Sequence, residues 1–254
     1  MECTKFNIII DQIKNNEITE LPFAWKRLSN SQIHSLAEAL KANATLTSLG
    51  LRYNKIGAEG AEEIAEALKV NTGLTSLNLG NNDIGDVGVD AIAEALKANT
   101  GLTSLYFGDN EIGDEGAKEI AEVLKANTGL TFLDLTDNFI GDEGAKEIAE
   151  ALEKNYSIVK ISGAFKNDTI DRYLERNKQI KDFAEKGGYV DSIEYFFSSV
   201  EGASELNTGS IVDSFLTGNY LTPAEQRNIH INAKLIEADA TLSGDSVSGN
   251  GGDS

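Results

Sequence analysis

The sequence predicts an α/β solenoid in which strand–helix units stack side by side, and three observations lead to this prediction. A string of the type Leu-Thr-Ser-Leu recurs every 28 residues, at Leu46, Leu74 and Leu102, and returns in altered form at Leu130. Each unit begins with alternating apolar and polar residues, which is typical of a half-buried strand. Apolar residues at spacings of three and four follow, which is typical of one helix face. A repeat of this length indicates stacked units that share a core.

The units read roughly LTSLxLxxNxIGDEGAxEIAEALKANTG, and repeats 1 to 6 begin at residues 18, 46, 74, 102, 130 and 158. The first five are complete and the sixth diverges. In repeat 3 we expect a strand over 74–79, a turn closed by Ile84, and then a helix. The buried face of that helix should hold Ile92, Ala93, Ala95 and Leu96. We expect Asn99-Thr100-Gly101 to end it, because Asn and Gly tolerate the left-handed conformation of a helix stop.

The widths of the elements predict a right-handed horseshoe with parallel strands inside and helices outside. Parallel strands lie about 4.8 Å apart, whereas packed helices need about 8–10 Å, so the strand side must be the concave side. A row of Asn54, Asn82, Asn110 and Asn138 follows the strands. We interpret it as a buried ladder in which each amide satisfies loop backbone groups, rather than as a ligand site.

We expect four segments in the chain. Residues 1–17 form an N-terminal helical cap, in which Ile9 and Ile13 cover repeat 1. The solenoid spans 18–186, with Pro22 placing repeat 1 at the edge of the sheet. Residues 187–242 should form a small helical appendix. The tail 243–254 has nothing to bury and is expected to be disordered.

The composition limits the partners. The chain has 41 acidic and 22 basic residues and a net charge of −19, which argues against nucleic acid or a membrane and favours a protein with a basic surface. A single cysteine rules out a disulfide within the chain and favours a reducing compartment. No apolar stretch reaches the roughly 20 residues that cross a bilayer. We expect a cytoplasmic protein that is monomeric when unbound.

The residue patterns predict no catalysis and no cofactor. Two histidines lie far apart in the sequence, at His34 and His230, and no metal-ligand spacing, nucleophile motif or phosphate-binding loop is present. Two enzymatic alternatives remain open. One is an activity in the helical appendix, and the other is a GTPase activator that uses Arg52, the one arginine expected on the inner face.

The 28-residue unit with LxxLxLxxNxI, a Gly-rich loop and an Ala-rich helix resembles the ribonuclease-inhibitor class of leucine-rich repeats over about 18–180. Repeat 1 departs from the pattern, since Lys26 replaces the asparagine. The resemblance implies the horseshoe fold and a protein partner. The class includes inhibitors, immune-receptor sensors, GTPase activators and secreted bacterial effectors. It thus leaves open an effector that enters a host cytosol to inhibit or recruit a target.

The residues that differ between repeats predict where a partner binds. We expect the third, fifth, seventh and eighth positions of each repeat to face inward, with the tenth on the rim. Most repeats carry small or polar residues there, but some carry Phe, or Trp, Tyr and Arg, and the last three are the types that dominate interface energetics. Scattered surface aromatics are the ordinary alternative. The predicted partner-binding residues are Trp25, Arg52, Tyr53, Tyr106, Asp109, Phe132, Asp134, Asp137 and Phe139.

Overall fold

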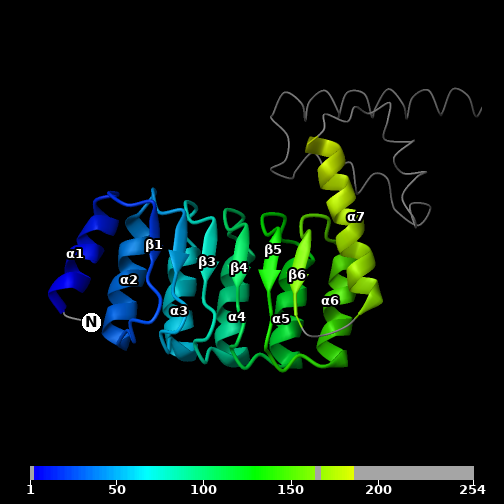
Figure 1. Ribbon diagram of the computed structural model, residues 1–254, viewed down its shortest axis with the longest axis horizontal. Coiled ribbons are helices and arrows are strands. Elements are labelled where there is room, and N and C mark those ends of the chain that lie inside the picture. The colour runs from blue at the N-terminus through cyan, green and yellow to red at the C-terminus, as the bar shows by residue number, and fades with distance from the viewer. Residues whose placement is uncertain (1–2, 164–166, 186–254) are drawn as a thin grey trace, which may run out of the picture. The chain divides into compact units, whose positions relative to one another are not determined.

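The structure, a computed structural model, describes residues 3–163 and 167–185. Within them, six parallel strands alternate with seven helices and form one sheet in sequence order (Figure 1). The strands are β1 (Glu20–Pro22), β2 (Ser48–Gly50), β3 (Ser76–Asn78), β4 (Ser104–Tyr106), β5 (Phe132–Asp134) and β6 (Lys160–Ser162). The helices are α1 (Cys3–Lys14), α2 (Asn30–Ala42), α3 (Gly57–Leu68), α4 (Gly85–Leu96), α5 (Asp114–Leu124), α6 (Asp142–Lys154) and α7 (Asp168–Glu185). The predicted helical segment 187–242 and the tail 243–254 lie outside the described residues.

The chain divides into two compact units, Met1–Lys178 and Gln179–Ser254, and the first contains all six strands and α1 to α6. Neighbouring strands pair with an offset of 28 residues, as in Leu49 with Leu77, which confirms the repeat. Each strand is shorter than predicted, since β3 covers 76–78 rather than 74–79. Backbone bonds between repeats nevertheless continue beyond it, from Leu79 N to Tyr106 O (2.9 Å) and from Asn81 N to Gly108 O (2.8 Å). No helix within 3–163 and 167–185 could cross a membrane.

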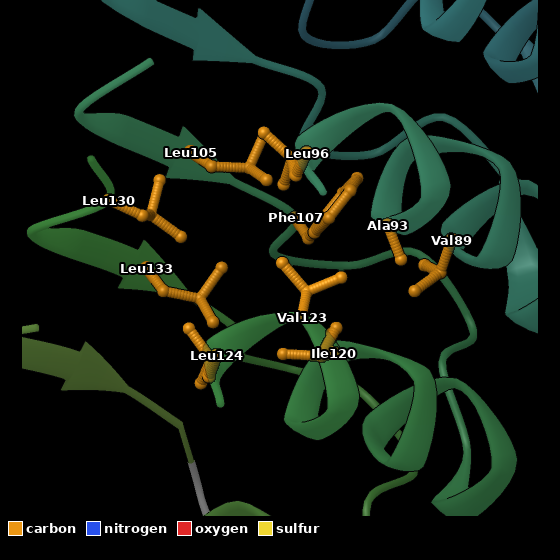
Figure 2. A pocket seen from close by; sticks show the side chains of 10 residues that line it. All are labelled: Val89, Ala93, Leu96, Leu105, Phe107, Ile120, Val123, Leu124, Leu130 and Leu133. Carbon is orange, nitrogen blue, oxygen red and sulfur yellow. The ribbon is translucent and has the colours of Figure 1, made fainter. Parts of the chain in front are cut away.

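The core lies between the sheet and the row of helices. In repeat 3 the predicted helix face is confirmed, since Ile92, Ala93, Ala95 and Leu96 are all buried. Repeat 4 departs from its neighbours, because Phe107 and Val123 replace the usual leucine and alanine. A cavity of about 10 Å³ remains there among apolar side chains from β4, β5, α4 and α5 (Figure 2). It offers no polar partner and is too small for a ligand, so it belongs to the packing.

The predicted asparagine ladder is confirmed. Asn82 is fully buried, and its side-chain amide donates to Leu51 O (3.0 Å) in the preceding repeat and to Leu79 O (2.8 Å) in its own. Its amide oxygen accepts from Asn54 N at 2.7 Å. Asn54 and Asn110 are buried in the same way, while Asn138 is half-buried. Each asparagine therefore satisfies backbone groups of the repeat before it, and the row is structural.

A second ladder corrects the predicted helix stop. Asn99, Thr100 and Gly101 are not among the residues whose backbone is left-handed. Instead Asn99 is buried, and its amide donates to Leu68 O and Asn71 O of the preceding repeat, both at 2.7 Å. Gly101 is required by close approach, because a Cβ there would lie 2.6 Å from Thr72 O.

A third contact, which the consensus did not reveal, joins successive helices. The Asp86 carboxylate in α4 accepts from Gly113 N (2.7 Å) and Gly116 N (3.1 Å) at the start of α5. Asp114 in α5 does the same for Gly141 N and Gly144 N at the start of α6. A carboxylate at a helix N-terminus satisfies unpaired N–H groups and interacts favourably with the helix dipole. Each aspartate thus caps the helix of the next repeat.

Both ends of the ladder are closed. At the N-terminal end α1 precedes repeat 1, and the Asn43 amide donates to Ile13 O of this helix at 2.6 Å. Its buried face holds Phe6, Ile10 and Ile13, and Ile9 is half-buried and packs against the same core.

At the other end Arg176 of α7 donates to Leu152 O (2.8 Å) and Asn155 O (2.7 Å), the two carbonyls that the asparagine of a further repeat would bind. Burial lowers the pKa of Arg176 to about 10, and the nearby C-terminus of α6 favours its charge.

Replacing Asn82 with leucine should lower the free energy of unfolding by about 1–3 kcal/mol, because buried backbone groups of two repeats lose their partners. Urea denaturation measures the change. The matched control is Asn78→Leu, at a half-buried side chain that accepts one hydrogen bond, from Gly80 N. Equal stabilities of the two variants would contradict the ladder.

Replacing Asp114 with alanine should lower the free energy of unfolding by about 0.5–2 kcal/mol, because the start of α6 loses its cap. Asp142→Ala is the control. It removes the same residue from the same helix position, but Asp142 is exposed and caps no following helix in the described chain. Thermal denaturation of both variants would show a larger loss for Asp114→Ala if the contact between repeats matters.

Candidate functional site

The predicted binding residues lie at the ends of the strands and in the loops that follow, except Phe132, which begins β5. We call the side chains at the third, fifth, seventh and eighth positions of each repeat the sheet face. Trp25 is exposed over 69% of its surface, and Arg52 is also exposed. Tyr53, Tyr106 and Phe132 are half-buried. These large side chains are therefore accessible while resting on their neighbours.

The structure brings Trp25 and Tyr53 together. Their rings stack with centroids 3.5 Å apart and an angle of 14° between the planes. The Arg52 guanidinium lies 4.7 Å from the centroid of the Tyr53 ring, and it also reaches the Asp109 carboxylate at 3.8 Å. Both charged groups are partly exposed, so this ion pair orients the arginine more than it stabilises the fold.

A second aromatic pair lies on β4 and β5. Tyr106 and Phe132 have ring centroids 4.9 Å apart and an interplanar angle of 45°. The Lys160 ammonium lies 5.3 Å from the centre of the Phe132 ring, a cation–π distance that the sequence-based prediction missed. The available signal was its place at the third position of repeat 6, in register with Phe132.

A hollow of about 290 Å³ lies on the sheet face beside the second pair. Part of the space arises at the seventh position of the repeats. Gly80 and Gly108 have no side chain there, whereas Arg52 and Thr136 fill the equivalent positions of repeats 2 and 5. The hollow is large enough for one side chain of a partner. It is lined by Arg52, Asn78, Gly80, Tyr106, Gly108, Asp134 and Thr136.

The predicted acidic residues fall into two groups. The Asp134 carboxylate lines the hollow and accepts from the Thr136 hydroxyl at 2.8 Å, and Asp109 accepts from the Asn81 amide at 2.6 Å. Asp137 and Phe139 are exposed in the loop after β5. Among the described contacts, no ring or side-chain interaction joins these two residues to either aromatic pair. The structure therefore does not gather all nine residues into one cluster.

The eighth position of each complete repeat has a left-handed backbone, which the sequence-based prediction also missed. The φ angles are 59° at Trp25, 61° at Tyr53, 59° at Asn81, 57° at Asp109 and 52° at Asp137. This conformation costs a non-glycine residue roughly 1–2 kcal/mol. Backbone bonds offset that cost, as from Trp25 N to Arg52 O and from Tyr53 N to Gly80 O, both at 3.0 Å. The loops thus present these side chains on a fixed ridge.

The arrangement is suited to contact rather than to bond chemistry. Within the described residues no three His, Cys, Asp or Glu side chains gather as metal ligands. His34 is exposed on α2 beside Glu63, as expected for a surface residue. The absence of catalysis and of a cofactor remains a prediction for the whole chain.

Comparisons with known proteins support the repeat type. Residues 59–180 match a family described as the TMOD/LMOD leucine-rich domain, and residues 42–65 match a leucine-rich repeat family. The chain is similar to the solved structure of leiomodin-1 actin-binding site 2, with 25% sequence identity and a TM-score of 0.50. That match covers 72% of this chain and 95% of the other.

A tropomodulin C-terminal domain from Caenorhabditis elegans matches with 16% identity and a TM-score of 0.50, over 72% of this chain and 98% of the other. At this identity the match concerns the fold alone. No curated protein shows significant sequence similarity to the chain. These comparisons do not test the ribonuclease-inhibitor class, which stays a prediction.

Proposed function

This chain is a leucine-rich repeat protein, and we propose that it is a non-catalytic module that binds another protein on the concave side of its sheet. The observation that supports the proposal is the clustering of aromatic side chains on the sheet face. Trp25 stacks on Tyr53, and Tyr106 packs on Phe132. The equivalent positions of other repeats carry small, polar or charged residues such as Gly50, Ser76 and Asp137, so the fold itself does not require these rings.

The proposed mechanism is docking of a partner across both aromatic pairs, with one side chain entering the hollow. Aromatic rings that are already packed lose little conformational freedom on binding and bury a large apolar area. Asp109 and Asp134 would select complementary basic groups and set the orientation of the partner. The contacts of Arg52 favour protein docking over GTPase activation. Its guanidinium already contacts the Tyr53 ring and the Asp109 carboxylate, whereas a GTPase activator would aim it at the nucleotide. We place this function in the cytoplasm.

We further propose actin as the first partner to test. The support is the similarity to a structure named for an actin-binding site and the match of residues 59–180 to the TMOD/LMOD leucine-rich domain. Sedimentation of the purified chain with actin filaments and binding to labelled actin monomers test the two forms of actin. If neither binds, the partner is another protein, and affinity capture with the wild-type chain would identify candidates.

The substitutions Tyr106→Ala and Phe132→Ala should each weaken partner binding by about 1–3 kcal/mol, because each removes a central aromatic anchor. Isothermal titration with the captured partner measures the loss. Val87→Ala, at an exposed apolar side chain on α4, is the control and should bind normally. Wild-type affinity in the double aromatic variant, with normal folding shown by circular dichroism, would refute the placement of the partner.

A further inference from the structure

Six residues in the loops of repeats 1 and 2 form a distinct surface, which we call the basic–aromatic patch. Four of them are basic and two are aromatic, and all but Tyr53, which is half-buried, are exposed. In a chain of net charge −19 such a concentration of cations is unexpected. The patch consists of Trp25, Lys26, Arg27, Arg52, Tyr53 and Lys55.

The same positions in repeats 3 to 5 have the opposite character. From the seventh to the tenth position they contain no basic residue and four acidic ones. The acidic residues are Asp83, Asp109, Glu111 and Asp137. The ridge beside the sheet face is therefore basic at its N-terminal end and acidic over the following repeats, and an average over the whole chain hides this division.

Three of the four cations of the patch differ in their surroundings from the lysines at the ends of α2, α3 and α5. On the outer helices Lys41, Lys69 and Lys125 each pair with a glutamate three residues earlier, at 2.5–2.6 Å. In the described part of the chain, Lys26, Arg27 and Lys55 make no such ion pair. Three positive charges thus face solvent without a neutralising neighbour.

The patch is also held in place. Trp25 N donates to Arg52 O at 3.0 Å, and Lys26 N donates to the buried Asn54 amide oxygen at 2.9 Å. Tyr53 contacts Trp25 through ring stacking and contacts the Arg52 guanidinium as well. The backbone and the two rings of the patch are therefore ordered before binding, which lowers the entropic cost of association, and binding would order mainly the charged side chains.

We propose that the basic–aromatic patch binds an acidic, apolar-containing segment of a protein partner, whose carboxylates face Lys26, Arg27 and Lys55. An apolar side chain of that segment covers the exposed face of Trp25. The assignment rests on the proposed function, since it gives the chemistry of the partner at one end of the sheet face. It reverses the expectation of a purely basic partner surface for repeats 1 and 2.

An acidic protein segment fits this surface better than nucleic acid does. Nucleic acid carries one charge per phosphate, and the −19 net charge of the chain opposes the approach of such a dense polyanion. A short acidic peptide has fewer negative charges, and all of them can lie opposite the basic residues of the patch. At about 0.15 M salt the Debye length is about 8 Å, so the patch acts on such a peptide with less interference from distant acidic helices.

The fluorescence of Trp25, the only tryptophan of the chain, provides a direct readout. The full-length chain is titrated at about 0.15 M salt with the peptide acetyl-Glu-Asp-Glu-Leu-Glu-Asp-Glu-amide. The isosteric peptide with Gln and Asn in place of Glu and Asp, and a single-stranded oligonucleotide, are titrated in parallel. We expect a saturable change in Trp25 emission with the acidic peptide alone.

Charge-reversal variants locate the binding. Lys26→Glu with Arg27→Glu should weaken peptide binding by about tenfold or more, because charge-assisted contacts become repulsive. Lys118→Glu with Lys146→Glu makes the same change in net charge on the outer helices and should bind like wild type. Melting curves confirm that both variants fold.

The assignment is overturned if the peptide causes no saturable change, if both variants bind it equally, or if the oligonucleotide binds more tightly. It is also overturned if sedimentation shows that the patch joins two copies of this chain. None of these results affects the loss of partner binding expected for Tyr106→Ala and Phe132→Ala, so failure of this assignment and failure of the proposed function can be distinguished.

Discussion

The structure depends on one constraint, which is that each repeat leaves buried backbone groups that the next repeat must satisfy. The turn after each strand and the end of each helix both expose peptide groups to the core, where an unpaired polar group costs about 1–3 kcal/mol. Asn82 and Asn99 both bond to the preceding repeat. Asp86 does the reverse by capping the helix that follows. Within the described residues no buried side-chain polar atom lacks a partner.

Because each asparagine bonds to the preceding repeat, the first and last repeats of the stack differ in what they need. Repeat 1 has Lys26 where later repeats have an asparagine, and the change is tolerated because no complete repeat precedes it. Its own loop is still completed by Asn54, which accepts from Lys26 N. The C-terminal end has the opposite problem, because no regular repeat follows α6. There Arg176 and Asn177 both donate to Asn155 O and so take over the work of the missing amide.

Much of the fold was predictable from the sequence because the 28-residue period fixes which residues repeat their environment. The strand–helix order, the buried helix face and the Asn82 ladder all follow from that period. The period does not reveal which backbone groups a polar side chain reaches, so Asn99 was interpreted as a helix stop. Arg176 was missed because it lies beyond the last regular repeat, where alignment of the copies no longer helps.

The candidate site was predictable in part. Comparison of equivalent positions identified Trp25, Tyr53, Tyr106 and Phe132 as irregular, because most other repeats have small or polar residues there. Which of them touch depends on side-chain direction and on the left-handed loops, neither of which the alternation of residues encodes. Lys160 was overlooked because repeat 6 diverges from the consensus. The division of charge along the ridge was hidden by the net charge of the whole chain.

The near-identity of the middle repeats has a consequence for how such a protein changes over time. Since the middle units bond to their neighbours in the same way, duplication or loss of one 28-residue stretch of coding sequence among them would preserve the fold. It would also move the Trp25–Tyr53 stack and the Tyr106–Phe132 pair apart or together by about 4.8 Å. The number of intervening units therefore sets the distance between the two aromatic pairs. A change in that number would alter which partner the protein recognises while every contact residue stays the same.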